Sequence, residues 1–125
     1  MGTDYKQLFV WQKSKLLVKF TYVITQQFPQ SELYGITNQM RRAAVSVPSN
    51  IAEGQMRETP GEYLQFIAIA QGSLAELDTQ MHIAHDVDYI TQQQLEEFST
   101  LHDEVSKMLA SLKIKIKDLK LQTKN

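Results

Sequence analysis

The hydrophobic positions of this chain recur every three or four residues along most of its length, a spacing that predicts amphipathic helices. In the first segment this spacing places five apolar residues on one side: Leu16, Leu17, Phe20, Ile24 and Phe28. We expect all five to face a core. A residue that precedes proline avoids the helical region, so Phe28-Pro29 predicts the end of this helix. The first predicted helix therefore covers about residues 6–28.

Two longer apolar seams follow in the second half of the chain, at about residues 60–86 and 92–120. Each predicted helix opens with a capping box, Thr59 with Glu62 and Thr91 with Gln94, and Pro60 suits a first helical position. The first seam consists of Leu64, Ile67, Ala70, Leu74, Leu77, Met81 and Ala84. The second consists of Leu95, Phe98, Leu101, Val105, Leu109, Leu112, Ile116 and Leu119. Repeats of this length are typical of helices packed along their whole length.

The segment at about residues 32–55 is unusual because its helical rhythm crosses Pro48. An interior proline removes one backbone hydrogen bond and clashes with the preceding turn, at a cost of about 3 kcal/mol. Either the helix breaks there or it continues with a kink. We favour the kink, because the apolar rhythm keeps its phase on both sides of the proline. Gly54 is then predicted to end the helix as a left-handed cap.

These elements predict the fold class. No segment alternates apolar and polar residues between glycine-rich turns, as strands of hairpins do. Helices joined by short connections pack as antiparallel neighbours. We therefore predict an all-α chain, with residues 1–125 forming a single antiparallel up-down four-helix bundle whose second helix is kinked at Pro48.

Composition excludes several classes of protein. Hydrophobic residues make up 42% of the 125 residues, enough for a core. The chain has no cysteine, so it has neither disulfides nor a thiolate nucleophile or ligand. No window reaches the roughly 18 uncharged apolar residues of a membrane span, and residues 1–6 do not resemble a signal peptide. We expect a soluble, cytoplasmic protein.

The net charge of -1 conceals a strong division along the chain. Residues 1–57 hold seven basic and three acidic residues, and residues 58–104 hold ten acidic residues without Lys or Arg. Residues 105–125 then hold six lysines and one aspartate. Such a division can serve a polyanion-binding face, can guide subunits together, or can belong to a merely solvated surface.

The second predicted helix gathers polar side chains that allow two interpretations. As a structural or interface network, they satisfy one another and fix the register of the helix; this set is Gln39, Arg42, Ser46, Asn50 and Glu53. As a nucleic-acid site, its arginines bind phosphate, a ligand that guanidinium groups suit; this set is Arg41, Arg42 and Arg57.

A second candidate for nucleic-acid binding lies at the C-terminal end. Four lysines recur at steps of four, three and four on one face of the last predicted helix: Lys113, Lys117, Lys120 and Lys124. A lysine stripe of this kind follows phosphates without reading base sequence, and its binding weakens with salt. The alternative is a solvated tail whose cations favour the C-terminal end of a helix. No aromatic residue interleaves with the stripe, so base stacking is not indicated there.

Enzyme chemistry has little support. A di-iron bundle needs Glu-x-x-His motifs, and the chain has none. His82 and His85 lie near Asp78 and Asp86, an arrangement more typical of exposed neighbours than of a metal site. Ser46 and Ser49 have no evident base to activate them, and no phosphate-binding glycine loop is present. We expect no enzymatic activity, no metal, no cofactor and no small-molecule substrate.

The residues of the second helix also carry a family resemblance. Glu32-Leu33-Tyr34-Gly35-Ile36, the run from Gln39 to Gly54 with its Ser-Val-Pro-Ser-Asn-Ile-Ala-Glu-Gly segment, and the run from Gln71 to Leu77 are similar to a bacterial four-helix bundle family. That family is named for the 23S ribosomal RNA intervening sequence. The resemblance covers nearly the whole chain and implies a protomer that assembles as a homopentamer with a central channel.

A related branch, the accessory variability determinant of diversity-generating retroelements, forms a basic barrel that binds nucleic acid and a reverse transcriptase. By motif match, this resemblance marks Arg41, Arg42, Asn50, Glu53 and Arg57 as residues of interest. The acidic middle of this chain departs from the basic character of that branch. The leading hypothesis is therefore a homo-oligomeric adaptor associated with nucleic acid or with a ribonucleoprotein. The alternative is a protein–protein scaffold that binds no nucleic acid.

Overall fold

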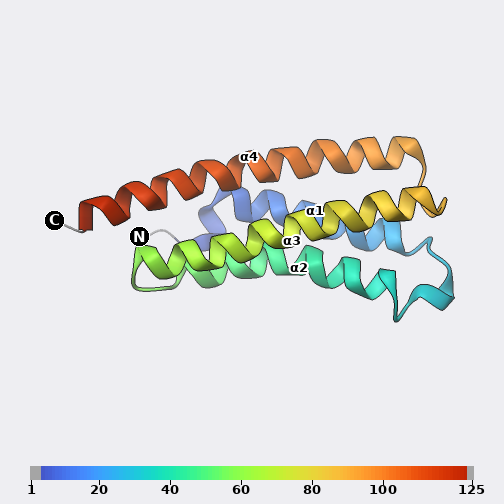
Figure 1. Cartoon of the computed structure of the whole chain (residues 1–125), viewed down its shortest axis with the longest axis horizontal. Coiled ribbons are helices and arrows are strands. Elements are labelled where there is room, and N and C mark those ends of the chain that lie inside the picture. The colour runs from blue at the N-terminus through green and yellow to red at the C-terminus, as the bar shows by residue number, and fades with distance from the viewer. Residues whose placement is uncertain (1–3, 124–125) are drawn as a thin grey trace.

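The computed structural model describes residues 4–123, and within this range all regular structure is helical. The long helices are α1 (Phe9–Thr25), α2 (Ile36–Gln55), α3 (Pro60–Asp86) and α4 (Gln92–Thr123). Two short 3-10 helices, η1 (Tyr5–Gln7) and η2 (Gln30–Glu32), precede α1 and α2. Figure 1 shows the four long helices lying side by side, with successive helices running in opposite directions. The predicted four-helix fold is confirmed.

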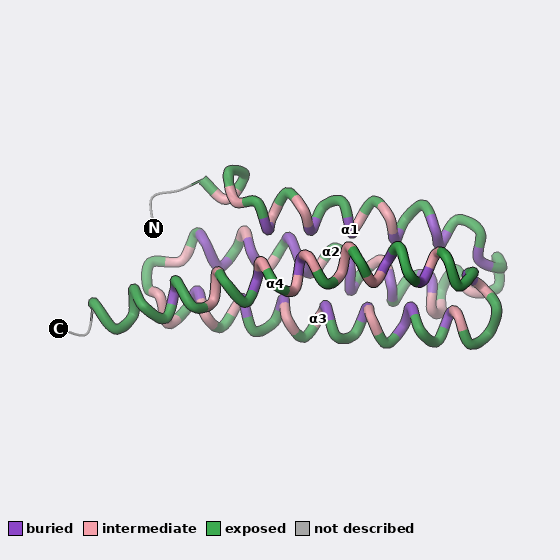
Figure 2. Tube along the Cα trace, turned by 90° about the horizontal axis from the view of Figure 1, so that it is seen from above, coloured by how far each residue is buried: buried purple, intermediate pink, exposed green. Residues whose placement is uncertain are grey.

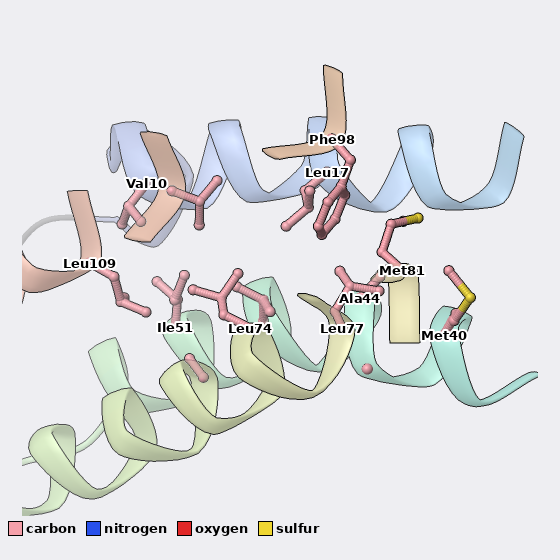
Figure 3. Packing of buried hydrophobic residues seen from close by; sticks show 14 of the residues in the cluster. Val10, Leu17, Met40, Ala44, Ile51, Leu74, Leu77, Met81, Phe98 and Leu109 are labelled. Atoms are coloured by element: carbon pink, nitrogen blue, oxygen red, sulfur yellow. The ribbon is translucent and has the colours of Figure 1, made fainter. Parts of the chain in front are cut away.

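Each helix packs against two neighbours. Both α1 and α3 contact α2 and α4, so α1 lies diagonally opposite α3. The inward stripe of every helix is buried, as the purple segments of Figure 2 show. Figure 3 shows Leu17 of α1, Phe98 of α4 and Leu77 of α3 pointing into the same interior. This shared core fixes the positions of the four helices, and therefore of their outer surfaces, relative to one another.

Four helix ends differ from those predicted. α1 begins at Phe9 rather than near residue 6, because Leu8 is extended between η1 and α1. α1 ends at Thr25 rather than at residue 28. Phe28 lies in the turn after α1, where it is buried against the ring of Tyr89 from the connection between α3 and α4. α2 begins at Ile36 rather than near residue 32, because Pro29 starts the 3-10 turn of η2. α4 continues past residue 120 to Thr123.

The helix α2 continues through Pro48, which is buried, so the alternative of a broken helix is excluded. Gly54 does not cap it, contrary to the prediction. The helix ends at Gln55, and its C-cap Met56 has a φ of -82°. Gly54 lies inside the helix because α3 approaches it closely. A Cβ atom at Gly54 would lie 2.8 Å from Cδ1 of Tyr63 and 2.9 Å from Cβ of Phe66.

The predicted capping box of α4 forms in full, and that of α3 forms in part, because Glu62 accepts from the hydroxyl group of Thr59 rather than from its backbone N–H. The Oγ1 atom of Thr59 accepts a hydrogen bond from the backbone N–H of Glu62 at 3.2 Å and donates to its carboxylate at 3.0 Å. At α4, the N–H of Gln94 donates to Oγ1 of Thr91 at 3.1 Å, and Oε1 of Gln94 accepts from the N–H of Thr91 at 2.9 Å. These contacts satisfy N–H groups that the first helical turn leaves without intrahelical partners.

Two residues of the predicted apolar seams are exposed, Leu119 near the end of α4, at 37%, and Leu16 of α1. Leu16 is 52% exposed, whereas Leu17 is completely buried. The inward face of α1 is completed by polar residues, Ser14, Thr21 and Thr25, which are also buried. Their hydroxyl groups donate to the carbonyl oxygens of Trp11, Leu17 and Thr21, respectively, so burial leaves none of them unsatisfied. Locally satisfied hydroxyl groups therefore occupy inward positions of α1 that the apolar pattern did not include.

The hydroxyl group of Tyr63 supplies a testable pH dependence. It is buried and has no hydrogen-bond partner among the described residues, and burial raises the pKa of Tyr63 to about 12. The unfolded chain loses this proton near pH 10, so stability is complete below pH 10 and falls as the pH rises toward 12, by about 2–3 kcal/mol in total. Thermal unfolding at pH 8 and pH 11.5 will measure this loss. Tyr63→Phe removes the titrating group and should lose less stability over that range, while costing little at pH 8.

Candidate functional site

Polar side chains join α2 to α3 at the middle of the bundle. The hydroxyl groups of Ser46 and Ser73 lie 2.7 Å apart. The Nδ2 atom of Asn50 donates to both the carbonyl oxygen and the Oγ atom of Ser46, at 2.8 and 2.9 Å. All three residues are only partly buried. The structure therefore brings Ser46 and Asn50 together, as the network interpretation expects, with Ser73 as a partner from the next helix.

The other residues of the predicted network lie close by but form separate contacts. Gln39 and Arg42 line a polar groove together with Ser46, Ser73 and Glu76. Arg42 is exposed and forms no hydrogen bond or ion pair within the described part of the chain. Glu53 pairs instead with Arg57, at 3.3 Å.

The three arginines predicted to bind nucleic acid do not form one cluster. The guanidinium of Arg57 lies 4.5 Å from the centre of the Phe66 ring and is engaged with Glu53. Arg41 lies on the opposite side of α2, where its Nε donates to Oγ1 of Thr25 at 3.0 Å and its guanidinium covers the Tyr22 ring. Arg42 lies between these two directions, so phosphate cannot bind all three arginines at one place.

Two lysines of the predicted stripe, Lys113 and Lys120, reach from α4 toward α3. Nζ of Lys113 reaches Oε1 of Gln71 at 3.5 Å, and the side chain of Lys120 passes near Gly61 at the start of α3. Lys117 lies between them on the same face and is exposed. Residues 117–122 are all exposed, and Figure 1 shows this end of α4 extending past the other helices. Lys124 lies outside the described residues.

A groove between α1 and α2, which sequence reasoning missed, combines aromatic and basic side chains. Its larger part has a volume of about 580 Å³ and is lined by Tyr5, Trp11, Val18, Val45, Pro48 and Ala52, with Lys15 and Lys19 at its edge. The adjoining part, about 480 Å³, shares Val45 and reaches Tyr22, Arg41 and Arg42. We call the two parts the α1–α2 groove.

Within the described part of the chain, the cations of the α1–α2 groove have no acidic partners. Nζ of Lys15 lies 4.3 Å from the centre of the Trp11 ring. Lys15, Lys19, Arg41 and Arg42 form no ion pair within residues 4–123. The signal that predicts one wall of this groove is the step of four, three and four from Trp11 through Lys15 and Val18 to Tyr22.

A second surface missed from the sequence is the outward side of α3. Seven exposed residues step by four and three along it: Gln65, Ile69, Gly72, Glu76, Thr79, Ile83 and Asp86. We call these the outer row of α3. Ile69 is 51% exposed and Ile83 45% exposed. The row has the spacing of a packing seam but lies on the side of α3 opposite its buried residues, and Glu76 at its edge also lines the polar groove beside Arg42.

The structure shows no arrangement suited to a bound metal within residues 4–123, where no group of three or more metal-binding side chains is found. His82 and Asp78 approach each other at 3.5 Å across one helical turn, with His82 exposed and Asp78 partly buried. In the same range, no helix combines the length and the apolar character needed to cross a membrane.

Comparisons with known proteins identify the relatives of this chain. The family described as 23S rRNA-intervening sequence protein matches residues 6–111. The solved structures include a protein of unknown function from the S23 ribosomal protein family of Bacteroides thetaiotaomicron, which is 21% identical to this chain. The superposition covers 83% of this chain and 97% of that one, with a TM-score of 0.74, so the two share a fold. No curated protein matches the chain.

Proposed function

The chain belongs to the family of 23S rRNA-intervening sequence proteins, and from this membership and its surface we propose a non-enzymatic, homo-oligomeric bundle that associates with nucleic acid or with a ribonucleoprotein. By the family resemblance, the oligomer is a pentamer. The observation that carries the nucleic-acid half of the proposal is the basic end of α4, which extends beyond the other helices.

The electrostatics of this end favour a polyanion. Lys113, Lys115, Lys117 and Lys120 lie within eight residues with one acid, Asp118. Lys115 and Lys117 are exposed and form no ion pair among the described residues. In an oligomer with parallel protomers, several copies of this end lie together, and their cations act on one polyanion. Lysines in such an arrangement contact phosphates and release counterions, which gives affinity without base specificity.

Fluorescence polarisation with a structured RNA and with single-stranded DNA will test this half of the proposal. We expect binding at ~50 mM salt that weakens steeply as salt rises. The double variant Lys117→Gln, Lys120→Gln should bind less tightly and show a smaller salt slope, because each lost phosphate contact reduces the slope by about one. The matched control is Lys6→Gln, Lys107→Gln, which makes the same change of charge elsewhere. Absence of binding at low salt, or equal losses in the two variants, contradicts the proposal.

The second candidate function is a protein–protein scaffold without nucleic acid. It is favoured by the α1–α2 groove and by the outer row of α3, two exposed surfaces that carry apolar side chains. A helix with apolar residues on both its inner and its outer side is typical of one that is covered on both sides. Light scattering across a salt series tests this function. The mass of the oligomer should fall as the salt concentration rises, because screening weakens contacts between exposed charges.

A further inference from the structure

We propose that protomers assemble by inserting the outer row of α3 of one copy into the α1–α2 groove of the next. The proposal rests on the proposed function, because it takes self-assembly as given, and it specifies which two surfaces meet. The occupant of the groove is thus a second copy of this chain.

The charges of the two surfaces are complementary. The groove presents Lys15, Lys19, Arg41 and Arg42 without acidic partners in the described part of the chain. The outer row presents Asp86, with Glu76 at its edge beside Arg42 of the same protomer, on a helix that has no lysine or arginine. Opposite charges on two faces steer association and fix its register, whereas two copies of the same face repel each other.

The apolar parts of the surfaces are complementary as well. The groove is a hollow walled by Trp11, Val18 and Val45, and the outer row offers two half-exposed isoleucines, Ile69 and Ile83. Between these isoleucines lies Gly72, around which no atom of the protomer comes within 4 Å of an added Cβ. A glycine in a helix interior weakens the helix, and nothing inside the protomer requires one here. Close approach by a second molecule supplies the reason, since an absent side chain lets another surface come near the helix.

The geometry also determines the symmetry. The groove lies between α1 and α2, and the outer row belongs to α3, the helix diagonally opposite α1. When two different surfaces of a protomer meet between copies they make a head-to-tail contact, and a head-to-tail contact that closes makes a ring. A two-fold dimer would instead require both contacts, row to groove and groove to row, to form at once between the same two copies.

Two variants that each disable one surface test this inference. The groove variant is Lys19→Glu with Val45→Glu, and the row variant is Ile69→Gln with Gly72→Gln. All four positions are exposed on helices, so both protomers should keep their helical circular dichroism and unfold cooperatively. Like charges across the interface should raise the dissociation constant of the groove variant by about 100-fold or more.

Mixing the variants gives the decisive result, which light scattering or native mass spectrometry will read. We expect the wild type to form a ring and each variant alone to be a monomer. An equal mixture should form a one-to-one heterodimer and nothing larger, because only one intact groove and one intact row remain in each pair. Trp11, the single tryptophan, lies in the groove, so dilution of the wild type to protomers should shift its emission to longer wavelength.

Three results would overturn the inference. If either variant keeps the mass of the wild-type oligomer, another surface carries assembly, and the proposed function stands without this interface. If both variants are monomers whose mixture stays monomeric, the two surfaces do not pair. If the wild type is itself a monomer, the oligomeric half of the proposed function fails as well; quenching of Trp11 by a polynucleotide would then assign the groove to nucleic acid instead.

Discussion

Leu17→Ala is expected to lower the free energy of unfolding by about 2–5 kcal/mol, whereas Leu16→Ala should change it by less than about 0.5 kcal/mol. The two residues are adjacent in α1 and undergo the same truncation. Leu17 is completely buried and Leu16 is 52% exposed. Figure 3 shows Leu17 pointing into the interior that Phe98 and Leu77 also enter. Truncation at Leu17 therefore loses apolar burial and leaves a cavity, and truncation at Leu16 does neither.

Urea unfolding followed by circular dichroism will measure both changes. All proteins must be compared at one concentration, because self-association adds concentration-dependent stability. Leu16→Ala is the matched control, since leucine and alanine have similar helix propensities and only the environment differs. Equal losses in the two variants would show that Leu16 is covered, either by the core or by a neighbouring molecule.

The contrast between these leucines shows how far the pattern of residues predicts this fold. Helical spacing and capping boxes predicted four helices, because both signals depend only on residues three or four positions apart in the sequence. The pattern failed at Leu16, where the buried positions nearby belong to Ser14 and Thr21. Hydroxyl groups that bond to a carbonyl three or four residues earlier are buried at little cost. Hydropathy alone assigns such residues to the surface. It therefore leaves Ser14 and Thr21 out of the inward face of α1 and places the exposed Leu16 in it.

The candidate surfaces were predictable to a smaller extent. Helical spacing predicts that Ser46 and Asn50 lie on the same side of α2. The partner of Ser46, Ser73, belongs to α3, so this contact depends on how α2 and α3 pack. The α1–α2 groove combines Trp11 with Val45, which are brought together only by tertiary structure. The outer row of α3 is visible as a second seam in the sequence. The entirely apolar inner seam beside it concealed that row, because a helix is normally assigned a single apolar face.

Gly54→Val should destabilise the protomer by about 3 kcal/mol through overpacking. The change places three carbon atoms where α2 and α3 are nearly in contact. Even the first of them, Cβ, would lie 2.8 Å from Cδ1 of Tyr63 and 2.9 Å from Cβ of Phe66. The first is an aromatic ring that is itself buried, and the second atom is attached directly to the backbone of α3, so neither can move aside without shifting that helix. Thermal unfolding should show a midpoint lower by roughly 10 °C. Gly54→Ala should show a smaller loss, because the higher helix propensity of alanine offsets about 1 kcal/mol of the clash.

Gly72→Val is the matched control, and its effect should appear in a different measurement. No atom comes within 4 Å of an added Cβ at Gly72, and valine favours a helix more than glycine does. The isolated protomer should therefore unfold at least as late as the wild type. If the outer row of α3 meets the groove of a second copy, the same valine should lower the mass of the oligomer, because it holds the two surfaces apart. A stable Gly54→Val protein would show that α2 and α3 have room to separate. An unfolded Gly72→Val protein would show that Gly72 serves the protomer rather than its assembly.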